Sequence, residues 1–229
     1  MKKIALLAVA FLAGSTAFAQ TTSTTTTNST GPKWGLKVGV NLPKYSFHVD
    51  DGKNPETGMS TNFHVTGYGD IPISSNFSFQ PGLSLQGKGA ELYDDDTFEI
   101  KDNTMWIEVP LNLVAKLPIS ANGTHFFLGA GPYAAYGIAG ERTTKYKEAT
   151  LTHNKGDKIS EDIEFGDKEG KDLKSLDLGV NFLGGVQLSN GFNIGAGYGL
   201  GINDLRPKNT TNDGKLTNRV LSFSLGYSF

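Results

Sequence analysis

The chain ends on the stretch Arg219-Val-Leu-Ser-Phe-Ser-Leu-Gly-Tyr-Ser-Phe229, and this stretch decides the fold. Every second residue is large and apolar: Leu221, Phe223, Leu225, Tyr227 and Phe229. The residues between them are mostly small or polar: Val220, Ser222, Ser224, Gly226 and Ser228. A period of two predicts a β-strand with one apolar face and one small or polar face.

The position of the aromatic residues in this stretch adds to the prediction. Phe229 is the last residue and Tyr227 lies two positions before it. This arrangement resembles the closing strand of an outer-membrane β-barrel. The resemblance implies that Tyr227 and Phe229 form the assembly signal read by the barrel-assembly machinery.

The first 19 residues have the pattern of a secretory signal peptide. Lys2 and Lys3 are followed by an apolar run from Ile4 to Ala13, and Ala17-Phe18-Ala19 is a small-x-small cleavage site. The apolar run is too short to span a bilayer as a helix. The chain has no cysteine, which excludes disulfides, thiol catalysis and cysteine-ligated metals.

Charge and hydropathy exclude two further classes. Without Lys2 and Lys3 the chain has 19 basic and 23 acidic residues, a net charge of −4, which argues against a nucleic-acid partner. Beyond the signal peptide there is no stretch of eighteen apolar residues, which excludes a helical membrane protein. A membrane β-barrel remains, because its strands mix lipid-facing and lumen-facing residues.

Residues 20–32 form a separate segment in which six of the seven residues from Thr21 to Thr27 are threonine. Such a segment has nothing to bury, so we interpret it as a disordered tether. Residues 33–229 remain as one domain.

Eight segments of this domain alternate between apolar and polar or small residues. They are residues 33–42, 61–71, 76–89, 104–119, 125–139, 173–188, 192–202 and 219–229. Each is long enough to cross the hydrocarbon layer when tilted, whereas strands of soluble proteins are usually about five or six residues long. The predicted fold is an all-β, eight-stranded, antiparallel, up-and-down transmembrane β-barrel.

The connections between these segments alternate strictly between short and long. Residues 72–75, 120–124 and 189–191 are short, whereas 43–60, 90–103, 140–172 and 203–218 are long and polar. In bacterial barrels the short turns face the periplasm and the long loops face outward. We therefore expect a bacterial outer-membrane location with a periplasmic tether and C-terminus. We expect residues 140–172 to form a two-stranded ribbon above the membrane.

Strand parity places charges of both signs in the lumen: Lys37, His64, Asp70, Lys88, Glu108, Lys116 and Asp177. Because unpaired charges in a narrow interior are costly, we expect an ionic network among Lys37, Lys88, Glu108, Lys116 and Asp177. Lys37, Lys88 and Lys116 are the candidate partners of Glu108, and Lys37 matches its depth best. Eight strands enclose a bore that side chains can fill, which favours a packed lumen over a conducting pore.

Three other patterns give no site. Residues 82–89 nearly match a phosphate-binding loop, but Gly89 replaces the required Ser or Thr and no helix follows. Acidic residues in 94–102 could bind a surface cation, but a solvated loop is the simpler interpretation. The histidines (His48, His64, His125 and His153) lack metal-ligand spacing. We therefore expect no metal, no cofactor and no catalytic residues. An enzyme that modifies lipid with His64 and Ser84 or Thr66 is the least favoured alternative.

The sequence Trp106-Ile-Glu-Val-Pro-Leu-Asn-Leu-Val-Ala-Lys116 is similar to the "L-E-[IV]-P-L" strand of the PorT-like outer-membrane barrels, often called the porin family. Gly35, Lys37 and Gly39 in the first strand agree with it. The resemblance implies a small closed barrel without catalytic residues, and a role in secretion or gliding for a minority of members.

The predicted function is a non-enzymatic structural or surface-interaction role through the outer loops. The alternatives are a narrow pore for ions or small solutes and an accessory subunit of protein secretion. The expected partners are outer-membrane lipid and lipopolysaccharide, the barrel-assembly machinery, and an unidentified surface or secretion partner.

Overall fold

The computed structural model describes residues 31–48, 57–150, 152–208 and 214–229. The predicted signal peptide (1–19) and residues 20–30 of the predicted tether lie outside these ranges. In the part of the chain that is described, no helix is long and apolar enough to cross a membrane.

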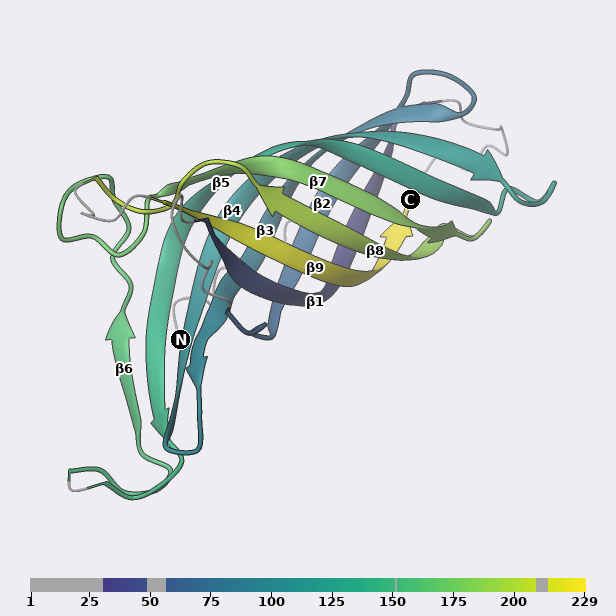
Figure 1. The fold of residues 1–229 in the computed structure, drawn as a ribbon. Helices are drawn as coiled ribbons and strands as arrows, with labels where there is room; N and C mark the ends of the chain where they lie inside the picture. The colour runs from purple at the N-terminus through teal and green to yellow at the C-terminus, as the bar shows by residue number, and fades with distance from the viewer. Residues whose placement is uncertain (1–30, 49–56, 151, 209–213) are drawn as a thin grey trace. The chain divides into compact units, whose positions relative to one another are not determined.

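Eight of the described strands pair in a closed antiparallel ring (Figure 1). They are β1 (Lys33–His48), β2 (Asn62–Pro72), β3 (Phe77–Asp94), β4 (Phe98–Pro118), β5 (His125–Tyr146), β7 (Leu176–Gln187), β8 (Phe192–Gly201) and β9 (Lys215–Ser228). The order is β4-β3-β2-β1-β9-β8-β7-β5, and pairing of β5 with β4 closes it. The predicted eight-stranded antiparallel barrel is confirmed.

The alternation in sequence becomes an apolar outside and a polar inside. Side chains such as those of Val38, Leu113 and Phe223 are exposed on the outside of the ring, whereas Glu108 and Asp177 are buried inside it. Successive side chains of a strand point to opposite faces, so one strand supplies both surfaces.

Pro110 lies at a break in the ladder between β3 and β4. The pairing runs to Pro81 opposite Leu111 and resumes at Ser84 opposite Glu108. Proline has no backbone donor for such a ladder. The ladder is therefore locally unpaired beside Glu108.

The connections at one end of the ring are tight. The N–H groups of Ile73, Ile119 and Leu188 donate to the carbonyls of Phe77, Thr124 and Phe192 at 2.8, 3.0 and 2.8 Å. Gly191 has a φ of 90°, which favours glycine. At this short-turn end β1 begins and β9 ends, with Gly35 opposite Ser228.

At the other, long-loop end, three ring strands continue beyond the ring and a ninth strand joins them to form a strand extension. It consists of residues 89–94 of β3, 98–103 of β4, 141–146 of β5, and β6 (Lys158–Asp162), which pairs with β5 alone (Figure 1). The two-stranded ribbon expected within 140–172 is confirmed, as the β5–β6 pairing.

The prediction of a solvated loop over residues 90–103 is wrong, because these residues complete a β3–β4 hairpin. The charges that favoured a loop are paired across the strands. Lys101 Nζ lies 3.1 Å from Glu91 Oε2 and 2.6 Å from Glu99 Oε1. Buried Asp102 accepts two bonds from Arg142, at 2.7 and 2.9 Å. Opposite charges on neighbouring strands thus stabilise a sheet that has few apolar residues.

Candidate functional site

A buried ion cluster crosses the lumen towards the long-loop end. Lys88 of β3 lies with Nζ 2.9 Å from Glu108 Oε2 of β4 and 2.9 Å from Asp177 Oδ2 of β7. The three side chains are 2, 3 and 0% exposed. Three strands on different parts of the ring are thereby connected through one ammonium group.

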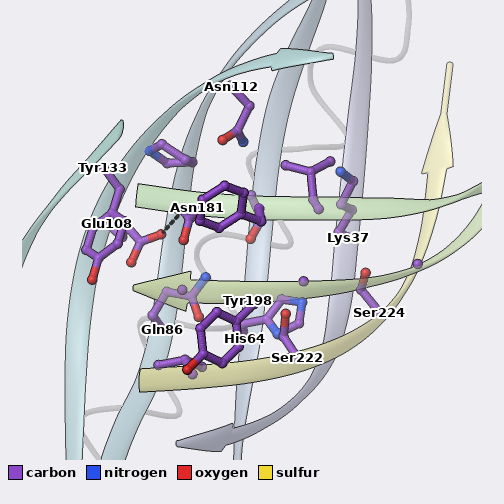
Figure 2. Close-up of a pocket in the computed structure, with 18 of the residues that line it drawn as sticks. Lys37, His64, Gln86, Glu108, Asn112, Tyr133, Asn181, Tyr198, Ser222 and Ser224 are labelled. Carbon is purple, nitrogen blue, oxygen red and sulfur yellow. Dashed lines mark hydrogen bonds between the residues drawn. The ribbon is translucent and has the colours of Figure 1, made fainter. Parts of the chain in front are cut away.

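Neutral side chains complete the ion cluster. Asn181 donates to Glu108 at 3.0 Å, a bond drawn in Figure 2, and Asn218 donates to Asp177 at 2.9 Å. The Tyr133 ring lies under the ammonium of Lys88, whose Nζ is 4.3 Å from the ring centroid. Buried charges are tolerated when they are paired and hydrogen-bonded, as these are.

Lys116 and Lys37 lie nearer the short-turn end. Lys116 Nζ is 2.5 Å from Asp70 Oδ2, so Lys116 pairs with Asp70 and not with Glu108. Lys37 Nζ lies over the rings of Tyr68 and Phe127, 4.4 and 5.6 Å from their centroids. An ammonium over an aromatic face is a favourable cation–π contact.

The prediction that Lys37 is the preferred partner of Glu108 is wrong, since Lys88 takes that place. Lys37, Thr66, Ser84 and Glu108 are successive partners across β1 to β4. Barrel strands tilt against the axis, so residues in one ladder row separate in depth from strand to strand. Over the three strand-to-strand steps from β1 to β4, this tilt places Lys37 at a different depth along the barrel axis from Glu108.

A cavity of about 110 Å³ lies in the lumen beside the ion cluster. Figure 2 shows Lys37, His64, Gln86 and Asn112 around it. On one wall the rings of Phe127 and Tyr133 in β5 cover Gly185 and Gly179, their directly opposite partners in β7. A cavity of this size holds a few waters, at about 30 Å³ each.

His64 does not pair with a hydroxyl group. Its Nδ1 lies 2.8 Å from Asn41 Oδ1, whereas the Ser84 and Thr66 hydroxyls bond to each other at 2.5 Å. A nucleophile activated by a base needs a hydrogen bond between the two. Among the described residues, His64 therefore does not serve as a base for Ser84.

An apolar cap lies at the long-loop end of the lumen. Ile163, Phe165 and Leu173, between β6 and β7, and Leu205, between β8 and β9, pack against Trp106 and other lumen-facing residues. Trp106 is fully buried and meets the edge of the Phe165 ring at 5.1 Å between centroids. No periodic pattern in the sequence indicates this cap; its signal in the sequence is isolated apolar residues within polar segments.

Asp204 fixes the second loop of the cap. Its Oδ1 accepts the Leu216 N–H at 2.9 Å and the Arg206 N–H at 3.2 Å. Burial alone would raise the pKa of Asp204, but these two N–H groups and the Arg206 guanidinium outweigh it and hold the pKa below its usual value. The ionised carboxylate thus fixes the backbone next to Leu205, which belongs to the same apolar cluster as Trp106.

Several acidic residues of the β3–β4 hairpin also have partners. Asp95 accepts the N–H groups of Thr97 and Phe98, both at 2.8 Å, and so forms the β3–β4 turn. Asp94 bonds to Lys147. The oxygens of Glu91, Asp94 and Glu99 lie close enough to bind a cation, but lysines already neutralise them.

Comparison with known proteins identifies the family of this barrel. The model of the outer membrane protein beta-barrel domain matches residues 18–206. The chain belongs to this family. The barrel therefore sits in the bacterial outer membrane, where the apolar outside of the ring contacts lipid. No curated protein matches the chain in sequence.

The chain is also similar to several solved structures at low sequence identity. Ail, the attachment invasion locus protein of Yersinia pestis, is 10% identical, with 87% of this chain and 99% of Ail covered and a TM-score of 0.41. Neisserial surface protein A is 12% identical, with the same coverage and TM-score. The N-terminal β-barrel domain of Pseudomonas aeruginosa OprF is 8% identical, with 85% and 97% covered and a TM-score of 0.37.

Proposed function

We propose that this outer-membrane barrel is a non-enzymatic surface protein that interacts through its long-loop end and does not conduct solutes. The observation that carries the proposal is the packing of the lumen with a buried ion cluster and, towards the long-loop end, with the apolar cap. The working surface is then the strand extension. The PorT-like resemblance of residues 106–116 supports a closed barrel.

The charge of the lumen supports the same conclusion. Lys88 lies between two carboxylates, and Lys116 is bonded to Asp70. Selective pores expose rings of charge to a water-filled channel. Here Lys88 and Lys116 are paired with carboxylates. The apolar cap lies between the ion cluster and the long-loop end.

Planar-bilayer recording tests the closure. The refolded full-length protein is expected to show no stable conductance steps in molar salt. A second variant lacks residues 164–173, which supply Phe165 and Leu173 to the cap. It is expected to show at most brief openings, because the ion cluster remains. Stable conductance of the unmodified protein would support the narrow-pore alternative instead.

In the proposed orientation the long-loop end lies outside the cell and both termini lie in the periplasm. The charged strand extension favours this, since such barrels expose their longer loops. A peptide tag inserted between Asn154 and Lys155, in the turn before β6, is expected to bind its antibody on intact cells. A tag after Gly31 is expected to bind only after the outer membrane is opened. Reversed accessibility would contradict the orientation.

The C-terminus is proposed as the assembly signal, with the barrel-assembly machinery as partner and lipid and lipopolysaccharide around the ring. Phe229 is 66% exposed, and its ring meets the Tyr227 ring at 5.2 Å between centroids. The Phe229 N–H donates to the Trp34 carbonyl at 2.8 Å, which fixes the end of β9 against β1.

Deletion of Phe229 is expected to reduce the outer-membrane level of the protein several-fold, because both the signal and this bond are lost. The measurement is immunoblotting of outer-membrane fractions. Deletion of Ile119, an exposed apolar residue in a short turn, serves as the control. Equal levels of the unmodified and Phe229-deleted proteins would refute the assignment.

A further inference from the structure

Strand β6 is an open edge of the strand extension. It is the last strand in the sheet order, and no described strand pairs with its free side. All five of its residues, Lys158 to Asp162, are exposed. An exposed edge presents unpaired N–H and C=O groups that can pair with another strand.

The groups on the free side belong to alternate residues. At the two ends of the β5–β6 ladder, Asp157 accepts the Tyr146 N–H and Ile163 donates to Gly140, both at 2.9 Å. In an antiparallel ladder such bonds recur at every second residue. The odd-numbered residues of β6 therefore bond to β5, and the N–H and C=O groups of Lys158, Ser160 and Asp162 point away from it.

Two of these three residues face like charges within their own chain. Lys158 lies opposite Lys145 and Asp162 lies opposite Glu141. Like charges directly opposite each other weaken a strand pair. Among the described residues, no ion pair within 4 Å involves Lys158 or Asp162.

We propose that the free edge of β6 pairs with β6 of a second copy of this chain, antiparallel and centred on Ser160. This register places Lys158 opposite Asp162 of the second copy, Ser160 opposite Ser160, and Asp162 opposite Lys158. The free backbone groups of all three residues then bond in closely spaced pairs. Each charge that faces a like charge in its own chain gains an opposite charge across the contact.

The proposed register favours a second copy of this chain over an unrelated strand as the partner of β6. Self-pairing matches two charges and three residues with free backbone groups at once, and Ser160 at the centre is small enough to face itself. The two strand extensions then form one continuous sheet. This inference rests on the proposed surface role and names one partner for it.

A single cysteine tests the contact, since the chain has no cysteine of its own. In the proposed register two Ser160 Cα atoms lie about 5.5 Å apart, within the range of about 4.4–6.8 Å that a disulfide spans. The matched control is Glu161→Cys, whose counterparts lie ~8 Å apart because each faces Ile159 of the other copy. In detergent-solubilised full-length protein under mild oxidation, Ser160→Cys is expected to give at least tenfold more disulfide dimer than Glu161→Cys. Equal yields would overturn the proposal.

Charge reversal in the Ser160→Cys background supplies the second arm. Lys158→Asp alone and Asp162→Lys alone each place like charges across the contact, and each is expected to lose most of the dimer. An equimolar mixture of the two variants is expected to recover it as a heterodimer, because both cross-contact pairs are again opposite in charge. Absence of recovery would overturn the proposed register.

Misfolding of the charge-reversal variants would not explain the expected loss and recovery of the dimer. Lys158→Asp faces Lys145 and Asp162→Lys faces Glu141, so each change improves the pairing of β6 with β5 in its own chain. The test is also independent of the surface role itself. Loss of cross-linking with an accessible tag beside Lys155 would refute self-pairing alone, whereas an inaccessible tag would refute the surface role.

Discussion

Replacement of Lys88 by methionine is expected to lower the free energy of unfolding by about 3–5 kcal/mol, the usual cost of leaving a buried charge without its partner. The substitution leaves the buried carboxylates of Glu108 and Asp177 close to each other without a cation between them. Methionine keeps the length of the side chain, so packing changes little. Urea unfolding in micelles, followed by circular dichroism, measures the loss.

Two further variants identify the cause of this loss. Lys101 also lies between two carboxylates, those of Glu91 and Glu99, but its side chain is 33% exposed in the strand extension. Lys101→Met is expected to cost no more than about 1 kcal/mol. Combining Lys88→Met with Glu108→Gln and Asp177→Asn removes the stranded charges and is expected to recover most of the stability. Equal losses for Lys88→Met and Lys101→Met would contradict the buried cluster.

Replacement of Trp106 by alanine is expected to cost a similar amount, about 3–5 kcal/mol, because a large buried ring is removed from the apolar cap. The indole also donates to Thr104 at 2.8 Å and meets the edge of Phe165. The cap should loosen before the ring of strands does. Limited proteolysis is therefore expected to cut residues 164–173 in a barrel that still resists heat in detergent.

Trp34 is the other tryptophan of the chain and serves as the control. It is 69% exposed on the outside of the ring, so Trp34→Ala leaves no cavity in the protein. Its loss of unfolding free energy in micelles is expected to be less than half that of Trp106→Ala. Resistance of residues 164–173 to protease in Trp106→Ala would refute the role of the indole in the cap.

The ring could be predicted from sequence because the alternation of residues within each strand indicates which side chains face lipid and which face the lumen. Parity alone placed Lys88, Glu108 and Asp177 in the lumen, and the short connections gave the tight turns. Which charges meet could not be predicted in the same way. That depends on tilt and register across several strands, so Lys88 and not Lys37 reaches Glu108.

The long-loop end was harder to predict, for two physical reasons. Residues 90–103 carry charges that indicate solvent exposure when each strand is considered alone, and their pairing appears only when β4 lies between β3 and β5. The cap depends on single apolar residues such as Leu205, which have no periodicity because they do not belong to strands. Sequence patterns detect repeating faces, not isolated contacts between distant loops.

The rings that cover glycines in β7 bear on how this barrel can diverge. A β-carbon at Gly179 would clash with both the Leu200 carbonyl oxygen of β8 and the Tyr133 ring. One at Gly185 would clash with both the Ile194 carbonyl oxygen of β8 and the Phe127 ring. A smaller residue on β5 would leave the contact with the β8 backbone, so both positions are expected to remain glycine among homologues. Tyr133 also lies under the ammonium of Lys88. A methyl group gained at Gly179 would thus disturb both the β7–β8 ladder and the aromatic ring beneath this buried charge.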